Sequence, residues 1–318
     1  MADLQKQFIE FHDTIAVDYE KRVLADKREK ILRRLEEGIK KQRESGIEIP
    51  KYSHRNQGSY AMGTGVKPLD GDYDLDVALI FAARKEDHPD PVLIKRWVYD
   101  ALDGHTKEVR VREPCVTVFY QSGGEPTFHV DFAIYVRAFD GAPTYLARGK
   151  LGSSAAHKSW ERSDPAGLID ALQSRFSNAY DRIQFRRVIR YLKRWKDITF
   201  SGEGQEAPRG ITLTACAYHW FSPVHPLEGG SRVSDDMEAL ARLVGKITDH
   251  FNGNRLSVRL PVVPENDLFS SMSDQQMQNV QNKLEVLGIT LRRARGEVDS
   301  HEAARMPARV FGSDFPVG

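Results

Sequence analysis

Apolar residues recur at helical spacing through the first part of the chain, among dense charges. The pattern covers residues 5–44 and predicts a long helix with one wet face, which would bridge two lobes of the molecule. Lysines and arginines crowd residues 21–43, but acidic residues alternate with them. This alternation favours a solvated, salt-bridged helix face over a stripe for binding nucleic acid.

A different pattern, of turns and short apolar runs, begins after Pro50. A glycine-rich segment at residues 58–65 precedes the turn Asp70-Gly71-Asp72, and an apolar run at residues 75–81 follows. This order predicts a glycine-rich turn, a short helix and a strand.

Three further elements complete the predicted sheet lobe. Residues 91–102 are amphipathic with proline in the first turn, which indicates a helix. Strands are predicted at residues 115–120 and 127–136, and residues 122–125 between them are typical of a hairpin turn. We therefore expect a small sheet backed by helices.

The second half of the chain has helical patterns. We expect helices at residues 165–176, 182–197, 213–221, 235–251, 274–287 and 301–311. The fold class is then α+β and bilobal. Residues 1–150 would form the sheet lobe with the N-terminal bridging helix, and residues 151–318 the helical lobe.

Composition limits the cellular setting and the partners. Hydrophobic residues make up 40% of the 318, enough for a sizeable core, and 46 Lys and Arg against 45 Asp and Glu give a net charge of +1. Any site for a polyanion must therefore be local. The two separated cysteines, Cys115 and Cys216, suggest neither disulfides nor a thiolate zinc site. Without a signal-peptide or transmembrane pattern, we expect a cytoplasmic protein that does not bind membranes.

Three aspartates are the candidate chemical centre. In the run Asp74-Leu75-Asp76 the strand period of two places both carboxylates on one face and Leu75 on the other. On the later strand Asp131 alternates with apolar neighbours and points away from the core. The three carboxylates could therefore share one site.

Such a site needs a compensating cation. Three converging carboxylates repel one another, and hard divalent ions prefer their oxygens. Two ions about 3.5–4 Å apart can activate a hydroxyl and neutralise a leaving pyrophosphate. Asp74, Asp76 and Asp131 therefore predict a site for two Mg²⁺, with Mn²⁺ as a substitute, and phosphoryl or nucleotidyl transfer. A lone Asp-x-Asp would be read as a solvated strand edge.

Two basic or phosphate-directed elements accompany the aspartates. Gln57-Gly58-Ser59 opens a short helical segment, where glycine lets the backbone approach a phosphate and the serine hydroxyl donates to it. Lys193 flanks the apolar stripe of a basic helix and could reach a triphosphate across a cleft. Alone, the first would be an ordinary turn and the second a surface basic helix.

The combined pattern resembles a known superfamily. Gln57-Gly58-Ser59-Tyr60, Asp74-Leu75-Asp76, Val130-Asp131 and Leu192-Lys193 with Trp195 look like the polymerase-β-type nucleotidyltransferases, and more narrowly the bacterial cGAS/DncV-like nucleotidyltransferases, or CD-NTases. Two other stretches, at residues 160–165 and 303–316, agree with this resemblance. The likeness spans nearly the whole chain and implies a polymerase-β-like fold with a small mixed sheet.

The resemblance implies an activity and a site. It implies synthesis of cyclic di- or trinucleotide second messengers from NTPs, ATP among them, in an anti-phage (CBASS-type) system with an effector protein that binds the product. Asp74, Asp76 and Asp131 would hold the two metal ions. Gly58, Ser59 and Gln57 would bind the donor triphosphate together with Lys193, and Thr212 would meet a nucleobase.

The resemblance also bears on partners. The vertebrate sensor's zinc-bearing DNA-binding insert has no counterpart, because the chain has no His/Cys cluster to build it. Some relatives are conjugated through their C-terminus by ubiquitin-transfer-like partners, which makes Gly318 a candidate conjugation site.

Two alternatives remain at this point. A linear oligonucleotide synthase or an RNA-modifying nucleotidyltransferase would use the same carboxylates, although the near-zero charge argues against a basic RNA track. A catalytically silent nucleotide-binding module would not need three repelling carboxylates. The histidines show no metal-ligand clustering, and His129 is read as a polar neighbour of Asp131 and not as a catalytic base.

Overall fold

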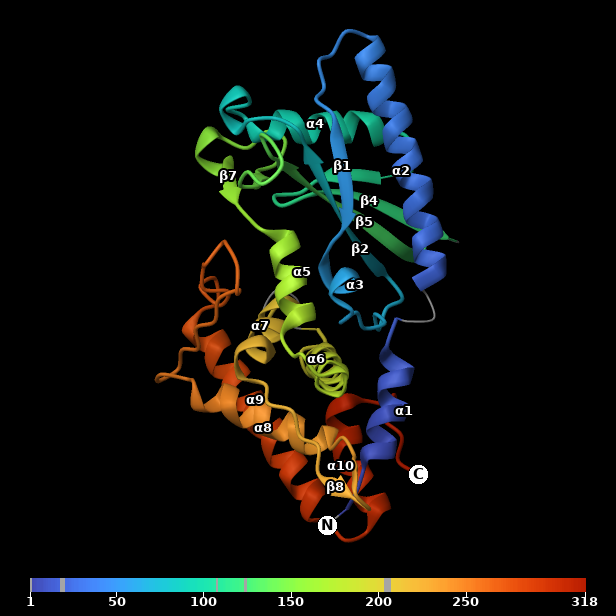
Figure 1. Cartoon of the computed structure of the whole chain (residues 1–318), viewed down its shortest axis with the longest axis vertical. Helices are drawn as coiled ribbons and strands as arrows, with labels where there is room; N and C mark the ends of the chain where they lie inside the picture. The colour runs from blue at the N-terminus through green and yellow to red at the C-terminus, as the bar shows by residue number, and fades with distance from the viewer. Residues whose placement is uncertain (1, 18–20, 107, 123–124, 203–206) are drawn as a thin grey trace.

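The computed structural model describes residues 2–17, 21–106, 108–122, 125–202 and 207–318. Figure 1 shows two lobes along the long axis, a sheet with helices above and a bundle of helices below, with both termini in the lower lobe. The predicted α+β, bilobal fold is confirmed. None of the described helices is long and apolar enough to cross a membrane.

The sheet contains seven strands in the described part of the chain. Their path is β1-β2-β5-β4-β3, and β6 and β7 continue from β5. β2 and β5 are parallel, and every other pair is antiparallel. The strand bounds are β1 Tyr52–Asn56, β2 Tyr73–Phe81, β3 Glu108–Val111, β4 Val116–Ser122, β5 Glu125–Val136, β6 Tyr145–Arg148 and β7 Ser159–Arg162. The turn residues 123–124 of the predicted hairpin lie outside the described residues, but β4 and β5 do pair.

One face of this sheet carries the core of the upper lobe. Leu75, Val77, Val130 and Phe132 are buried there with apolar side chains of helices α2 (Lys21–Glu44) and α4 (Pro91–Leu102). The strand period leaves the opposite face for polar side chains near the start of β2, which is where the aspartates lie.

The N-terminal segment differs from the prediction. A single long helix is wrong, because helix α1 (Gln5–Ile15) ends at Ala16, whose backbone is extended with φ −73° and ψ 138°. Ala16 forms a β-bridge with Val66, and the Ile15 carbonyl accepts from the Lys67 N–H. These bonds to a distant loop replace the helical ones. α1 therefore packs in the helical core and α2 on the sheet.

The lower lobe follows the predicted helices, with shifted ends. Asn178 caps the helix predicted at 182–197, which starts earlier than expected, and the helix predicted at 274–287 continues to Gly296. The bounds are α5 Pro165–Ser174, α6 Ala179–Thr199, α7 Gly210–Trp220, α8 Asp236–Asp249, α9 Asp274–Gly296 and α10 Ser300–Phe311, and a short hairpin, β8 Leu227–Glu228 with β9 Ser231–Arg232, precedes α8.

The lobes are not divided strictly along the chain. β7 extends the sheet beyond residue 150, and Phe8 and Phe11 of α1 pack against Phe311 and Phe315 at the other end of the sequence. The division at residue 150 stays a prediction.

Candidate active site

The three aspartates come from two neighbouring parallel strands. Asp76 of β2 lies directly opposite Asp131 of β5, and Asp74 lies opposite His129. Leu75 and Val77 point into the core on the other face, with exposed fractions of 4% and 1%. Hydrophobic burial of the alternating residues thus fixes the register that brings the carboxylates together.

These carboxylates are costly to ionise together. Burial, and then the charges of Asp74 and Asp131, raise the pKa of Asp76 to about 8. Burial and the Asp74 charge also raise the pKa of Asp131, against the hydrogen bond from Thr117. Repulsion among carboxylates at one point is relieved by a divalent cation.

A histidine belongs to the same cluster. His129 Nε2 lies 3.3 Å from Asp74 Oδ1, and its Nδ1 lies 3.2 Å from Asp72 Oδ2. Burial lowers the pKa of His129, but the bonds and charges of Asp74 and Asp72 outweigh it and raise the pKa to about 9. The expectation that no histidine shares a metal-type cluster is therefore wrong. Strand alternation from Asp131 was the signal that could have found it.

Side chains of this cluster could hold a metal ion. One ligand atom each from Asp74, His129 and Asp131 lie within 4.8 Å of one another. Asp72 Oδ1 is buried and has no hydrogen-bond partner among the described residues. Carboxylate oxygens at this separation are the ligands that hard divalent ions take.

A buried threonine holds Asp131. The Thr117 hydroxyl of β4 donates to Asp131 Oδ1, because the β4–β5 register sets the two residues opposite each other. Thr117 is fully buried, and Cys115 Sγ lies 3.5 Å from its hydroxyl. The bond fixes one carboxylate oxygen and leaves Oδ2 without a constraint from Thr117.

The predicted phosphate-binding motif lies beside the carboxylates. Gly58 has φ +65°, and a Cβ placed there would collide with the Asp76 carboxylate, so only glycine fits. The Gln57 N–H donates to the Asp76 carbonyl at 3.0 Å, and Gln57 Oε1 accepts from the Tyr135 hydroxyl at 3.0 Å. Ser59 follows in the short helix α3 (Gly58–Met62).

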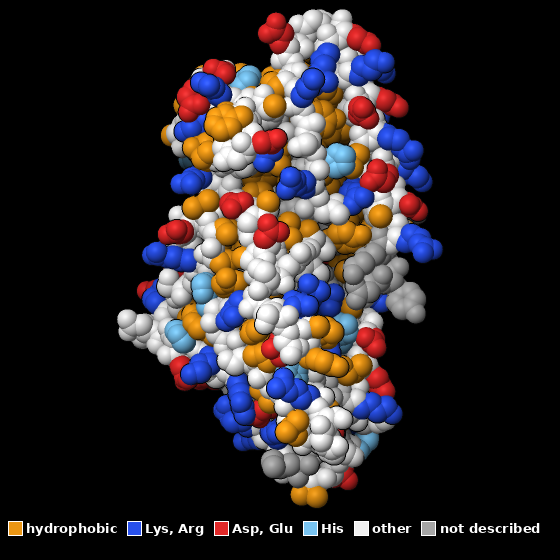
Figure 2. Space-filling view, viewed as in Figure 1, with side chains coloured by type: hydrophobic (Ala, Val, Ile, Leu, Met, Phe, Trp, Pro, Cys, Tyr) orange, Lys and Arg blue, Asp and Glu red, His pale blue; other side chains and the backbone are white. Residues whose placement is uncertain are grey.

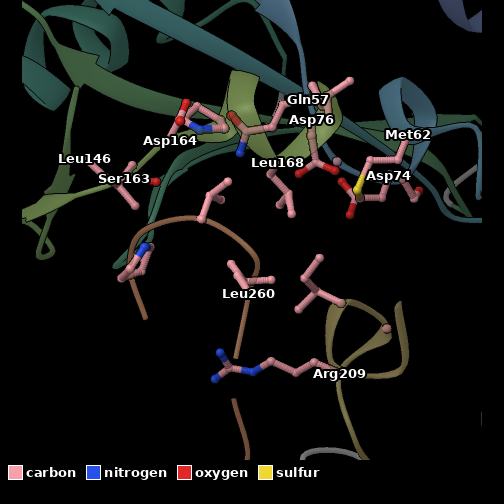
Figure 3. A pocket seen from close by; sticks show the side chains of 18 of the residues that line it. Gln57, Met62, Asp74, Asp76, Leu146, Ser163, Asp164, Leu168, Arg209 and Leu260 are labelled. Carbon is pink, nitrogen blue, oxygen red and sulfur yellow. The ribbon is translucent and has the colours of Figure 1, made fainter. Parts of the chain in front are cut away.

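A cavity of about 580 Å³ joins this motif to the helical lobe. Gln57, Met62, Asp74 and Asp76 lie on one side of it in Figure 3, and Arg209 and Leu260 lie across from them. The lining residues from outside the predicted site include Tyr135, Glu161, Ser163, Asp164, Lys196, Asp197, Arg209 and the segment 260–264, except residue 261.

Of the two site residues predicted in the helical lobe, Lys193 lines the cavity and Thr212 does not. Lys193 of α6 lines the cavity, and its ammonium donates to the Thr64 carbonyl at 3.0 Å and the Thr64 hydroxyl at 3.2 Å. Burial, and then nearby cations, lower the pKa of Lys193 to about 8. Thr212 is 1% exposed and is not among the residues that line the cavity.

The segment that carries the candidate site matches a known family model. Residues 52–135, which contain the motif and all three aspartates, match the family described as cyclic GMP-AMP synthase DncV-like, nucleotidyltransferase domain. A cyclic GMP-AMP synthase from Escherichia albertii is 26% identical over 157 residues, covering 46% of this chain and 32% of that protein. The match thus spans about a third of the curated relative's length.

The whole fold also has solved counterparts. The CD-NTase CdnG of Bradyrhizobium diazoefficiens, solved with GTP, superposes with a TM-score of 0.70 at 17% identity, covering 98% of both chains. CdnC of E. coli MS115-1, solved with ATP and also as a HORMA-deltaN complex, gives 0.68 at 17% identity and the same coverage. Vibrio cholerae DncV gives 0.65 at 20% identity, covering 84% of this chain and 70% of that one. These likenesses show the shared fold.

Proposed function

We propose that this chain, which belongs to the bacterial cGAS/DncV-like nucleotidyltransferases, joins NTPs into cyclic di- or trinucleotide second messengers. The observation that carries the proposal is the register of the parallel strands. It sets Asp76 beside Asp131 and Asp74 beside His129, next to a cavity that Gly58 and Ser59 also line. Simple nucleotide binding would not require so many acidic groups at one point.

The carboxylates of Asp74, Asp76 and Asp131 would hold two Mg²⁺, which Mn²⁺ could replace. When bound, such ions neutralise the triphosphate and make a ribose hydroxyl more acidic. Asp131 would take the proton of the attacking ribose hydroxyl at Oδ2, the oxygen that Thr117 does not hold. The ribose oxygen then bonds to the α-phosphorus, and pyrophosphate leaves.

Other residues would restrain the donor nucleotide. Glycine at position 58 lets the backbone lie against the Asp76 carboxylate at the cavity wall. The Ser59 hydroxyl, which lines the same cavity, can donate to a phosphate. The Lys193 ammonium lies at the cavity wall and would exchange its bonds to Thr64 for triphosphate oxygens. Gln57, which lines the cavity and is held by the Tyr135 hydroxyl, would contact the nucleotide directly. The buried Thr212 lies outside the cavity lining, and we assign it no contact with the nucleotide.

The likeness to this family supports a proposal for the biological setting. We propose anti-phage (CBASS-type) signalling in the cytoplasm, with an effector protein that binds the cyclic product. Gly318 is exposed beyond the buried anchor Phe315, which suits conjugation by a partner. In this proposal residues 1–150 supply the carboxylates and residues 151–318 supply Lys193.

The test is product analysis. Purified protein is incubated with each radiolabelled NTP, alone and mixed, with Mg²⁺ or Mn²⁺, and the products are treated with phosphatase and identified by mass spectrometry. We expect phosphatase-resistant cyclic products. Linear products would favour the oligonucleotide-synthase alternative, and products formed only on added RNA would favour an RNA-modifying enzyme.

Matched variants separate catalysis from folding. Asp76→Asn should abolish turnover while the circular dichroism spectrum stays unchanged. Asp87 is exposed and ends the short 3-10 helix Lys85–Asp87 before α4, so Asp87→Asn should behave as wild type. Full activity of Asp76→Asn would contradict the assignment of the carboxylates.

A further inference from the structure

Strand β1 leaves one edge of the sheet open. Within the described residues β1 pairs only with β2. The Ala82 N–H donates to the Lys51 carbonyl, and the Gln57 N–H donates to the Asp76 carbonyl. Because paired and unpaired residues alternate in an antiparallel ladder, the N–H and C=O groups of residues 52, 54 and 56 face outward. His54 is exposed.

The open edge has a basic hollow on one face. This hollow, of about 510 Å³, lies between β1 and α2, where the same view in Figure 2 shows basic side chains beside hydrophobic atoms. Tyr52 and His54 line it from β1. Its charged lining comprises four basic side chains and two acidic ones, namely Arg33, Lys40, Arg43, Lys51, Glu29 and Glu36.

The other face of the same strand has a second, more apolar hollow. It measures about 360 Å³, and Ser53 lines it from β1 while Ile80 and Ala82 line it from β2 and the residue after β2. Its rim also carries charged side chains, namely Lys51, Arg137 and Asp140. Phe139, from the loop after β5, forms one wall and is 67% exposed. A partner side chain packed on this ring would remove its apolar surface from water.

We propose that β1 is a docking site for an extended segment of a partner protein, which adds a strand to the sheet. Its main chain would pair with residues 52, 54 and 56. Side chains of an added strand alternate between the two faces, so acidic ones would enter the basic hollow and apolar ones would pack on Phe139. The partner's chemistry is therefore an alternating acidic and apolar sequence.

Charge and main-chain hydrogen bonding select this occupant over two others. A second copy pairing through β1 would bring Lys51 and Arg55 of both chains to one seam, and these like charges repel. Nucleic acid offers no main-chain ladder to the open edge of β1. An acidic extended peptide meets both the charge and the hydrogen-bonding groups.

The test uses labelled peptides and the full chain. A fluorescein-labelled ten-residue peptide of alternating Glu and Val is titrated with the protein by anisotropy, beside an alternating Lys and Val peptide and a Glu-Val peptide N-methylated at alternate residues. We expect saturable binding of the first, with at least tenfold weaker binding of the others. Amide hydrogen exchange at His54 should slow only with the first.

Three variants locate the site. His54→Pro removes an outward N–H without removing a hydrogen bond to β2. Phe139→Ala removes the exposed ring. The double variant Arg33→Glu with Lys40→Glu reverses two of the four positive charges that line the basic hollow. Each should weaken binding about tenfold or more. Lys246→Glu, an exposed reversal on α8, should change nothing. None of these residues belongs to the proposed active site, so product synthesis should be unchanged.

Several outcomes would overturn the proposal. These are absence of saturable Glu-Val binding up to millimolar protein, equal binding of the Lys-Val or N-methylated peptide, and binding that His54→Pro leaves intact. A 20-base-pair RNA duplex provides the remaining arm. The basic hollow is a nucleic-acid site instead if the protein binds the duplex, if the charge reversals abolish that binding, and if His54→Pro leaves it unchanged.

Discussion

Asp76 is the residue where burial and repulsion oppose ionisation most directly. Its pKa is raised to about 8 by burial and by Asp74 and Asp131, far above the usual value for an aspartate. Between about pH 4 and pH 8 the folded protein holds a proton that the unfolded chain has released. Without metal, the free energy of unfolding should therefore fall as pH rises, by on the order of 2–4 kcal/mol from this residue.

The measurement is urea unfolding with EDTA at pH 5.5 and pH 8. Asp76→Asn, which cannot ionise, should lose most of this decrease and be more stable than wild type at pH 8, although inactive. Asp87→Asn should keep the wild-type decrease. An identical pH dependence in Asp76→Asn would show that the carboxylates are not coupled as described.

Thr117 is expected to act by positioning Asp131. Thr117→Val keeps the buried shape but removes the donor to Asp131 Oδ1, so the carboxylate loses its fixed orientation. Loss of such a supporting bond typically costs about 10–100-fold in activity or metal affinity. We expect kcat to fall by this factor and the half-saturating Mg²⁺ concentration to rise.

Thr117→Ser is the matched control, since it retains the hydroxyl. It should restore most of the activity and the Mg²⁺ dependence. Wild-type kcat in Thr117→Val, in a protein that folds normally, would rule out the positioning role.

Residue patterns predict some of this site and not the rest. Alternation with Leu75 and Val77 was enough to place Asp74 and Asp76 on one face. The contact between Thr117 and Asp131 depends on the pairing of β4 with β5 along their length, which no short pattern encodes. His129 could have been found from its spacing to Asp131, but its bonds to Asp72 and Asp74 depend on the parallel pairing of β2 and β5.

At the scale of elements, helix α6 is fixed by a buried ion pair with α8. Arg187 donates two hydrogen bonds to Asp236, at 2.6 and 2.8 Å, and Asp236 is fully buried. Gln184 and the Tyr191 hydroxyl also donate to this carboxylate. Asp236→Ala would leave the guanidinium buried without its partner and should lower the free energy of unfolding by about 3–5 kcal/mol.

Arg242→Ala provides the comparison on the same helix. Arg242 is 60% exposed and pairs with Glu238 at 2.7 Å, so its loss should cost less than about 1 kcal/mol. Denaturant titration of both variants checks the difference. Equal costs would mean that the buried pair does not fix α6 more firmly than a surface pair does.

Helices were predicted correctly where each buries a single hydrophobic face in a single core. The six helices of the second half were predicted from that pattern. It failed at residues 5–44, because α1 and α2 each have an apolar face but bury it in different cores. The break comes from the bonds of Ile15 and Ala16 to the loop at 66–67, which are long-range and have no local signal.

At the scale of the molecule, the helical lobe holds the loop that follows the phosphate-binding motif. Arg190, Lys193 and Arg194 of α6 donate to the carbonyls of Gly65, Thr64 and Lys67, at 3.0–3.1 Å. The cavity is completed by residues as distant as 262–264. Its lining depends on how the lobes meet, and so the sequence did not predict Arg209, Glu161 or Asp164 as cavity residues.

Lys193 of the helical lobe donates to Thr64 of the sheet lobe, and its deprotonation should lower the activity at high pH. Its pKa is lowered to about 8, chiefly by burial, so the ammonium that attracts a triphosphate is lost above that pH. The ratio kcat/KM reports the free enzyme. For ATP with saturating Mg²⁺, we expect kcat/KM to fall about fivefold from pH 8 to pH 9 because the charged fraction falls by that factor.

Lys193→Arg separates this residue from other groups that titrate nearby. A guanidinium stays charged throughout this range, so the variant should lose some activity by altered geometry but keep a flat kcat/KM between pH 8 and pH 9. Lys193→Met should lower kcat/KM at pH 7.5, where Lys193 is charged in wild type. If Lys193→Arg shows the same fivefold fall, the pH limit belongs to another group, and the lysine would contribute mainly by holding Thr64 across the junction of the lobes.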